Sequence, residues 1–380
     1  MTTIVLEGWR FLPHSYALWA MYLALEWGVQ TDRRVYFRDA PFADASWRPA
    51  RGVLSEAQEA MIAALPAPPA GVMADLHVRI TFPYDFSPSD AARTIVLGTT
   101  EYGFVPPTFM KGGEPISAAA ARSGFTIGTP TKWSMDGFLR SGVKRTQMFL
   151  APNGIDPAVF RPAAEEERAA LRRDLGWDGH FVLLHNSNLG WNKNLEGILY
   201  GLGRVAEVEP NVHLVIKGVD ALYPSAKVME RMSAFPDATL AERVLPRVSY
   251  VGESMSMEHV ARFYKAADAY VCPYLAEGFN MPALEAAACG LPVICTKGGS
   301  TDDFVTDAFA LRVASTVTAD QATGGRVLMP NIEHYVEQLR RVVKDGAFRA
   351  RARVAGPAHA HGGWMWSHAA DKVLRAAGLA

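Results

Sequence analysis

Residues 277–292 read EGFNMPALEAAACGLP, and this stretch decides how the whole chain is interpreted. It follows an apolar run, AYVCPYL (269–275), which predicts a buried strand. Pro282 suits the first turn of a helix, because its missing N–H would have no partner there. The spacing therefore predicts a strand, a loop that contains Glu277, and a helix that carries Glu285 three residues after Pro282 and stops at Gly290.

A helix that begins at this loop has unpaired backbone N–H groups and a partial positive charge, so its start attracts phosphate. Ligands of open α/β sheets bind at the carboxyl ends of parallel strands. Glu285 could accept hydrogen bonds from two ribose hydroxyls, and Glu277 could hold a second sugar, so the spacing suits a nucleoside diphosphate sugar. The spacing leaves one alternative open, in which Glu285 only favours the helix dipole and Glu277 is a surface loop residue.

Short runs rich in Val and Ile alternate with amphipathic stretches along the chain, which predicts parallel sheets with helices on both faces. The expected strands cover 2–8, 33–39, 75–81, 93–100 and 124–130 in the first half and 180–187, 212–218, 247–253, 269–275 and 291–297 in the second. Each set predicts a doubly wound unit. The turn signal Asn153-Gly154, with Pro152, Pro157 and Pro162 around it, marks the boundary between them.

We therefore expect two Rossmann-like domains, residues 1–155 and 156–355. A helix over about 333–344 precedes a predicted break at GPAHAHGG (356–363). The remaining residues, 356–380, are expected to form a C-terminal helix that packs back towards the first domain.

Composition excludes several classes of protein. The 380 residues are 49% hydrophobic and 20% charged, a globular balance, and 38 basic against 39 acidic residues leave no footprint for nucleic acid. Cys272, Cys289 and Cys295 lack a Cys-x-x-Cys spacing and predict buried thiols. The stretch MTTIVLEGWRF (1–11) lacks a charged segment and a long apolar run, so we do not expect secretion, and no stretch reaches the about 18 to 20 apolar residues that would span a bilayer. These features predict a cytoplasmic protein, with a peripheral membrane contact as an open alternative.

The stretch EGFNMPALEAAACGLPVICTKGGSTDDFV (277–305) resembles the donor-binding signature of retaining glycosyltransferases of family 4. FLAPNGIDPAVFRP (149–162) is similar to the linker of these enzymes, and NLGWNKNLEGILYGL (188–202) is similar to the segment that carries their phosphate-binding lysine. EGWRFLPHSYALWAMYL (7–23) and VLGTTEYGFVPP (96–107) resemble the N-terminal half of a subset of them. The likeness covers nearly the whole chain and is stronger in the second half.

The resemblance implies an α/β chain with the GT-B fold, in which two Rossmann-like domains face each other across a cleft. The first domain would bind the acceptor and the second the donor. It also implies transfer of a sugar, with retention at the anomeric carbon, from a nucleoside diphosphate sugar to the hydroxyl of a glycan, a lipid-linked or a small-molecule acceptor. No cofactor and no obligatory metal are implied.

The resemblance also implies the roles of particular residues. The catalytic residues would be Glu277, Lys193 and Glu101. The donor would be bound by Glu285, Phe279, Asn280, Met281, Asn188 and Lys217, and the acceptor side would include Tyr102 and Ser15, the latter as a helix N-cap. Asn188 stands where these enzymes usually have arginine, and a neutral amide cannot match the forked contact of a guanidinium. Lys217 either replaces that charge or faces solvent at the end of its strand.

Two other classes compete with this interpretation. The departure at Asn188 leaves open a non-catalytic protein that binds nucleotide sugars. GLGRVA (201–206) has the letters of a dinucleotide-binding loop and would favour an oxidoreductase, but the pattern places it in a helix with no strand before it. His359 and His361 have the spacing of a metal pair, but they fall in a stretch expected to be a loop with no third ligand nearby.

Overall fold

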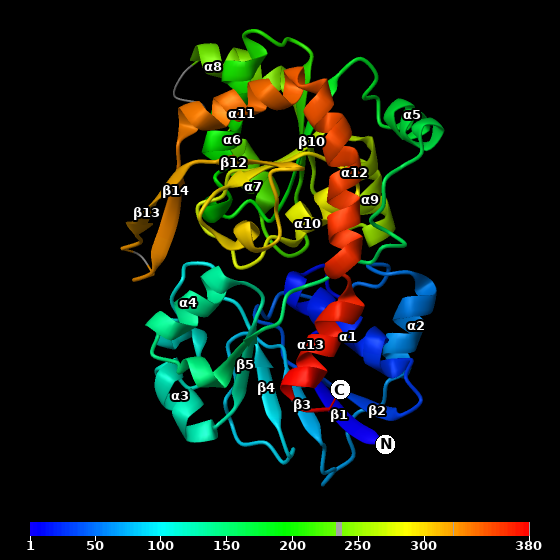
Figure 1. The fold of residues 1–380 in the computed structure, drawn as a ribbon, viewed down its shortest axis with the longest axis vertical. Helices are drawn as coiled ribbons and strands as arrows, with labels where there is room; N and C mark the ends of the chain where they lie inside the picture. The colour runs from blue at the N-terminus through cyan, green and yellow to red at the C-terminus, as the bar shows by residue number, and fades with distance from the viewer. Residues whose placement is uncertain (233–237, 322, 380) are drawn as a thin grey trace. The chain divides into compact units, whose positions relative to one another are not determined.

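A computed structural model describes residues 1–232, 238–321 and 323–379 (Figure 1). The chain forms two compact units. Unit 1 consists of Met1–Gly154, Ala319–Arg326 and Trp364–Ala380, and unit 2 consists of Ile155–Thr318 and Val327–Gly363. The last change of unit therefore falls between Gly363 and Trp364, after the position proposed from the sequence, and unit 1 includes a short segment, Ala319–Arg326, from the second half of the chain.

Unit 1 is built on a six-stranded parallel sheet in the order β2-β1-β3-β4-β5-β6. Its strands are β1 (Thr2–Gly8), β2 (Arg33–Asp39), β3 (Leu76–Arg79), β4 (Thr94–Leu97), β5 (Thr126–Thr129) and β6 (Met148–Leu150). Its helices are α1 (Ser15–Gly28), α2 (Glu56–Ala64), α3 (Ile116–Ser123), α4 (Lys132–Arg140) and α13 (Trp366–Ala376), with 3-10 turns η1 (Pro107–Phe109) and η2 (Arg145–Gln147). All five strands expected in the first half are confirmed, and β6 was not predicted.

The C-terminal helix α13 packs on α1 inside unit 1, as Figure 1 shows. The ring of Trp366 stacks on the ring of Tyr22 with their centroids 4.8 Å apart. Gly154 passes so close to α13 that an added Cβ would lie 2.3 Å from the backbone N of Trp366. The last residues of the chain therefore belong to the core of the unit that the first residues build.

Unit 2 contains the second six-stranded parallel sheet, in the order β12-β11-β10-β7-β8-β9, and a two-stranded sheet of β13 and β14. Its strands are β7 (Phe181–Asn186), β8 (Val212–Lys217), β9 (Val248–Val251), β10 (Ala269–Cys272), β11 (Val293–Thr296), β12 (Ala310–Val313), β13 (Ser315–Ala319) and β14 (Arg326–Pro330). The five strands expected in the second half are confirmed, and β12, β13 and β14 were not predicted.

Helices surround this second sheet. They are α5 (Glu165–Asp174), α6 (Leu195–Ala206), α7 (Ser225–Met232), α8 (Ala238–Val244), α9 (Met257–Ala266), α10 (Met281–Ala288), α11 (Ile332–Lys344) and α12 (Gly346–Gly363), with 3-10 turns η3 (Trp191–Lys193), η4 (Leu245–Arg247) and η5 (Ser300–Asp303). GLGRVA (201–206) lies inside α6, as expected, so it is not a phosphate-binding loop.

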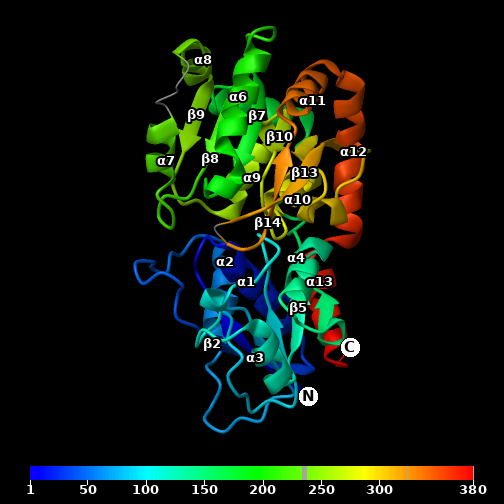
Figure 2. The ribbon, with the colours of Figure 1, turned by 90° about the vertical axis from the view of Figure 1, so that its left-hand side faces the viewer.

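The predicted break at residues 356–363 is wrong, because these residues continue α12 through Pro357. The helix packs against α10 at this point (Figure 2). A Cβ on Gly356 would lie 2.5 Å from the carbonyl oxygen of Ala287. Packing of two backbones at this distance needs glycine, and the contact outweighs the helix-breaking tendency of Gly-Pro. His359 and His361 therefore lie on a helix and not in a loop.

Two further sequence expectations concern buried groups and membrane spans. The three cysteines are free thiols and are buried, as predicted. In the part of the chain that the structure describes, none of the helices combines the length and the apolar character needed to cross a bilayer.

Candidate functional site

The order in which strands are added to the sheet of unit 2 reverses between β7 and β10. Successive strands run outward from β7 through β8 to β9, and then the chain returns to β10 on the other side of β7. Loops that leave the carboxyl ends of two such strands diverge and leave room for a ligand. The loop after β7 carries Lys193 on η3, and the loop after β10 carries Glu277. Two of the three residues predicted to be catalytic, Lys193 and Glu277, therefore follow the strands on either side of this point.

Lys193 and Glu277 form an ion pair, with Nζ 2.8 Å from Oε1. Their side chains are only 9% and 12% exposed. A pair with so little solvent around it is screened weakly, so its charges act strongly on any ligand placed beside them.

The asparagines on both sides of Lys193 fix its position. Asn192 donates from Nδ2 to the Ala276 carbonyl at 2.9 Å, and its own carbonyl accepts from the N–H of Leu275 at 2.8 Å. Asn194 donates to the Pro273 carbonyl at 2.8 Å and caps the start of α6. Its φ of 58° lies in the left-handed region, which asparagine tolerates. The sequence Asn-Lys-Asn thus attaches the lysine loop to the segment that leads to Glu277.

The loop after β10 ends at Asn280, which caps α10. Asn280 has a φ of 74°, and its Oδ1 accepts from the N–H of Ala283 at 3.1 Å. The helix begins at Met281, so Pro282 lies in its first turn, as predicted. Phe279 is buried against Phe304, with ring centroids 4.9 Å apart, so it packs the loop onto the unit.

Glu285 is the fifth residue of α10 and is 3% exposed. Its Oε2 accepts a hydrogen bond from the hydroxyl of Tyr264 at 2.9 Å. Burial raises the pKa of Glu285 to about 7, and the Tyr264 hydrogen bond opposes that rise. The Glu285 carboxyl is therefore a buried group, and Glu277, whose side chain is 12% exposed, is not the surface loop residue of the alternative interpretation.

Asn188 and Lys217 are both engaged with the backbone. The Oδ1 of Asn188 accepts from the N–H of Gly190 at 3.1 Å, which shapes the turn before Lys193. Lys217 is 4% exposed, and its ammonium donates to the carbonyl oxygens of Gly218 and Glu253. Burial lowers the pKa of Lys217 to about 8. The interpretation of Lys217 as a solvent-facing residue is wrong, and its ammonium supports the loops that follow β8 and β9.

In unit 1, Glu101 and Tyr102 lie in the loop after β4, and three successive carbonyl groups of this loop are bonded. The Glu101 carbonyl accepts from Trp133 Nε1 at 2.7 Å, and the Tyr102 carbonyl accepts from the N–H of Arg326 at 2.7 Å. The Gly103 carbonyl accepts from Arg140 at 2.6 and 3.0 Å. The contact of Arg326 with this loop could not be predicted from the sequence, since Arg326 lies in a segment more than 200 positions away.

The prediction that Ser15 is a helix N-cap is wrong by one position. His14 is the N-cap of α1, and its Nδ1 accepts from the N–H of Tyr16 at 3.1 Å. A ring nitrogen replaces the hydroxyl oxygen that caps more commonly. Ser15 is the exposed first residue of the helix.

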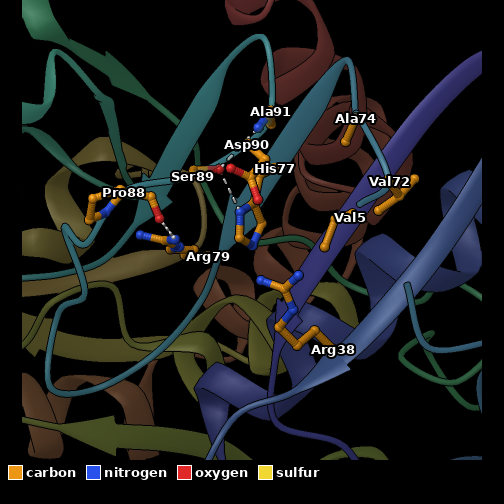
Figure 3. A pocket seen from close by; sticks show the side chains of 10 residues that line it. All are labelled: Val5, Arg38, Val72, Ala74, His77, Arg79, Pro88, Ser89, Asp90 and Ala91. Carbon is orange, nitrogen blue, oxygen red and sulfur yellow. Dashed lines mark hydrogen bonds between the residues drawn. The ribbon is translucent and has the colours of Figure 1, made fainter. Parts of the chain in front are cut away.

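A cavity of about 60 Å³ opens on one face of the unit 1 sheet and contains none of the predicted site residues (Figure 3). Figure 3 shows Arg38, His77 and Arg79 around it, with the segment 88–91 opposite. Glu7 Oε2 lies 2.9 Å from His77 Nε2 and 3.3 Å from Arg79 Nε, so these ion pairs join β1 to β3. Arg79 also donates hydrogen bonds to the backbone carbonyls of residues 85, 87 and 88. These contacts favour a structural role, in which Arg79 anchors the connection from β3 to β4.

Among the residues that the structure describes, no group of three or more His, Cys, Asp or Glu side chains is arranged to hold a metal ion. His361 contacts the carbonyl oxygen of Phe160 through Nε2 at 2.9 Å.

Comparison with known families identifies the class of protein. The model of the glycosyl transferases group 1 family matches residues 167–359, just over half of the chain. The chain belongs to this family, as the sequence motifs predicted. The match contains β7 to β14 and every site residue described above in unit 2.

Curated relatives are similar over part of their length. The chain is 27% identical over 230 residues to a GDP-mannose-dependent monoacylated alpha-(1-6)-phosphatidylinositol monomannoside mannosyltransferase of Corynebacterium glutamicum, which covers 58% of this chain and 54% of that protein. It is 32% identical over 234 residues to a D-inositol 3-phosphate glycosyltransferase of Mycobacteroides abscessus, which covers 60% of this chain and 45% of that protein. The chain spans about half the length of these relatives.

Solved structures share the fold over the whole chain. HepE of Anabaena in complex with UDP-glucose has a TM-score of 0.71 at 15% identity and covers all of both chains. Sucrose-phosphate synthase from Thermosynechococcus elongatus has a TM-score of 0.67 at 16% identity, over 99% of this chain and 98% of that one. With two parallel six-stranded sheets in one chain, these likenesses confirm the predicted GT-B fold class.

Proposed function

We propose that the protein is a retaining glycosyltransferase, which moves a sugar from a nucleoside diphosphate sugar to an acceptor hydroxyl in bacterial-type glycan or glycoconjugate synthesis. The observation that carries the proposal is the buried Lys193–Glu277 pair at the switch point of the sheet, one loop away from the start of α10 and from Glu285. Family membership supports transfer chemistry, and the names of the relatives support nucleotide sugars as donors.

The proposed reaction assigns a physical role to each group. The bond between the anomeric carbon and the diphosphate breaks, and Lys193 with the N–H groups at the start of α10 stabilises the negative charge of the leaving group. The acceptor oxygen attacks from the same face, which retains configuration, and its proton passes to the diphosphate. Glu277 holds the transferred sugar and Glu285 holds the ribose. The proposal assigns the charge of the diphosphate to Lys193 and the start of α10, and it includes no obligatory metal.

The names of the relatives indicate which donor bases to test first. One curated relative is GDP-mannose-dependent, and one structural neighbour was solved with UDP-glucose, so guanine and uracil are the bases to test first. The acceptor is a glycan, a lipid-linked molecule or a small molecule, at the Glu101–Gly103 loop of unit 1. We place the reaction in the cytoplasm, where nucleotide sugars are donors.

Thermal unfolding with UDP, GDP, ADP and dTDP, each with and without magnesium, tests the donor site. A ligand at about 100 times its dissociation constant adds roughly 2.7 kcal/mol to the free energy of unfolding. One diphosphate should stabilise the protein, and Glu285→Gln should abolish that response. Glu333→Gln is the matched control, because its side chain is 64% exposed in α11 of the same unit. Failure of all four diphosphates to stabilise the protein would overturn the donor site.

Release of the nucleoside diphosphate from GDP-mannose and UDP-glucose then tests catalysis. Lys193→Ala should lower turnover by roughly one to three powers of ten, as expected when one preorganised electrostatic donor is lost. Unchanged turnover in that variant would contradict the role of Lys193.

A non-catalytic nucleotide-sugar-binding protein is the second candidate, and Asn188 favours it. A neutral amide that is already used to bond Gly190 offers a leaving diphosphate no charge. This candidate predicts that the wild-type protein binds a diphosphate but releases none from either sugar nucleotide, whatever acceptor is added.

A further inference from the structure

Three side chains from three elements form a chain of hydrogen bonds that ends at Glu285. Asn186, the last residue of β7, donates from Nδ2 to the hydroxyl of Tyr264 on α9 at 2.9 Å. The Tyr264 hydroxyl donates to Oε2 of Glu285 on α10, also at 2.9 Å. Tyr264 is 0% exposed and Glu285 is 3% exposed, so water does not compete for these bonds.

The direction of donation along these hydrogen bonds is fixed by which groups carry a proton. A tyrosine hydroxyl has one proton, and an amide N–H that donates to its oxygen leaves that proton free to point elsewhere. The only hydrogen-bond acceptor for it in the described contacts of Tyr264 is the Glu285 carboxylate. This series of hydrogen bonds begins at Asn186. The backbone carbonyl of Asn186 accepts a hydrogen bond from the Tyr270 hydroxyl at 3.2 Å, which helps to fix the position of Asn186.

We infer that Tyr264 is a positioning residue for the ribose-binding carboxylate of Glu285, and that Asn186 sets the direction of its proton. The inference rests on the proposed function, in which Glu285 binds the ribose. A carboxylate has about four acceptor positions, so one bond from Tyr264 fixes its plane and leaves positions for the two ribose hydroxyls. No substrate contact by Tyr264 is required.

The surroundings of Glu285 make this hydrogen bond important. Burial raises the pKa of Glu285, and the Tyr264 hydroxyl is the group that opposes the rise. Tyr270 from β10 and Cys289 from the end of α10 are the other titratable groups that interact with it. Among the described residues no cation pairs with Glu285, and neither β11 nor α12, which packs on α10, supplies it with a hydrogen bond. Without the Tyr264 hydroxyl, the ionised Glu285 carboxylate would therefore have no hydrogen-bond donor among the described residues.

Tyr264→Phe tests the inference, with Tyr335→Phe as the matched control. Tyr335 is also 0% exposed in unit 2, but its hydroxyl is buried with no hydrogen-bond partner. Tyr335→Phe therefore measures the effect of removing a buried tyrosine hydroxyl that positions no other group. Dissociation constants for UDP and GDP are measured by calorimetry from about pH 5.5 to about pH 8.5, the range over which the carboxyl titrates. Tyr264→Phe should weaken binding at neutral pH by roughly tenfold to a hundredfold and move the midpoint of the pH dependence upward.

Asn186→Asp provides a second variant that opens no cavity. Its carboxylate accepts the Tyr264 proton, so Glu285 should lose its donor although the tyrosine remains. The pKa of Glu285, followed by carbon NMR of labelled glutamate without ligand, should rise in both variants and not in Tyr335→Phe.

The possible outcomes separate the two proposals. If Tyr264→Phe matches Tyr335→Phe in diphosphate binding, in pH midpoint and in the Glu285 titration, the inference is overturned while the donor site stands. If the wild-type protein binds neither diphosphate, the proposed function is wrong. Tyr264 then has no role in ribose binding, even if the pKa of Glu285 followed by NMR shifts as expected.

Discussion

The ammonium of Lys193 lies 2.8 Å from Oε1 of Glu277, although 84 positions separate the two residues in the sequence. Breaking a buried ion pair by removing one partner leaves an uncompensated charge and costs about 3–5 kcal/mol. We expect Lys193→Met and Glu277→Gln each to lower the free energy of unfolding by that amount. The double variant should cost less than the sum of the two, because the second substitution removes the charge that the first exposed. Urea denaturation of the four proteins measures this.

The surface pair Arg204–Glu333 in the same unit is the control for this cycle. Its atoms are 3.1 Å apart, but its side chains are 31% and 64% exposed. Solvent screening reduces such a pair to about 0–1 kcal/mol. If the Lys193 and Glu277 variants lose no more stability than Arg204→Met and Glu333→Gln, the pair is not a buried charge site.

Glu285 should make stability depend on pH. Its pKa rises from 4.5 to about 7 on folding, so between these values the folded state binds more protons than the unfolded state. The free energy of unfolding should therefore fall as pH rises from about 4.5 to about 7, by on the order of 3 kcal/mol. Glu285→Gln cannot titrate and should lack this contribution. Denaturation of both proteins across this range measures the difference, and parallel curves would show that the carboxyl does not titrate as stated.

Two glycines of α12 should respond to alanine in opposite ways. Glycine-to-alanine in a helix normally stabilises by up to about 1 kcal/mol. Gly362 has no atom within 4 Å of an added Cβ and should follow that rule, whereas a Cβ on Gly356 would meet the Ala287 carbonyl of α10 at 2.5 Å. Gly356→Ala should therefore destabilise by about 1–3 kcal/mol and weaken diphosphate binding, since α10 must shift. A gain in melting temperature for both variants would contradict the close packing of α12 on α10.

The sequence predicted the parts of the fold that are marked by hydrophobic periodicity. Most of the ten expected strands are apolar runs that are buried in their sheets, and their alternation with amphipathic stretches led to the correct fold class. Two of them, β2 and β9, are largely half-buried or exposed. Strand β6 has three residues, which is too short for a pattern, and β13 (STVTA) is polar and largely exposed. The extent of α12 was missed for another reason, because the contact of Gly356 with α10 is tertiary and outweighs the local Gly-Pro signal.

The sequence points to Glu277 and Glu285 because a helix start and two carboxylates are visible in one short stretch, and their roles in donor binding stay predictions. Tyr264 could not, since ARFYKA is an ordinary amphipathic segment and only the packing of α9 against α10 brings its hydroxyl to Glu285. Ser15 was misplaced by one position because a histidine ring caps α1. The roles of Glu101 and Tyr102 stay predictions, for the structure shows how their loop is held and not what it binds.

The loop Glu101–Gly103 allows the acceptor assignment to be tested separately from the donor site. Trp133→Phe removes the donor to the Glu101 carbonyl but keeps an aromatic ring at the position over which the Arg326 guanidinium lies, 5.4 Å from the ring centre. Because the predicted donor residues all lie in unit 2, diphosphate binding should stay within about twofold of wild type. Transfer should fall by about tenfold to a hundredfold, the size of effect expected when a reacting group is displaced by about 1 Å.

Glu101→Gln should give the same division between unchanged binding and lost transfer, since it replaces the side chain that the loop presents. Trp177→Phe is the control, because Trp177 is a buried tryptophan of unit 2, packed on Phe263. Calorimetry with UDP and GDP measures binding, and diphosphate release from the sugar nucleotides measures transfer. If binding and transfer are lost together, Glu101 contributes to the donor site. If both variants keep full activity, this loop has no role in the mechanism. The loop would then be a structural joint, whose three bonded carbonyls stabilise unit 1 and nothing more.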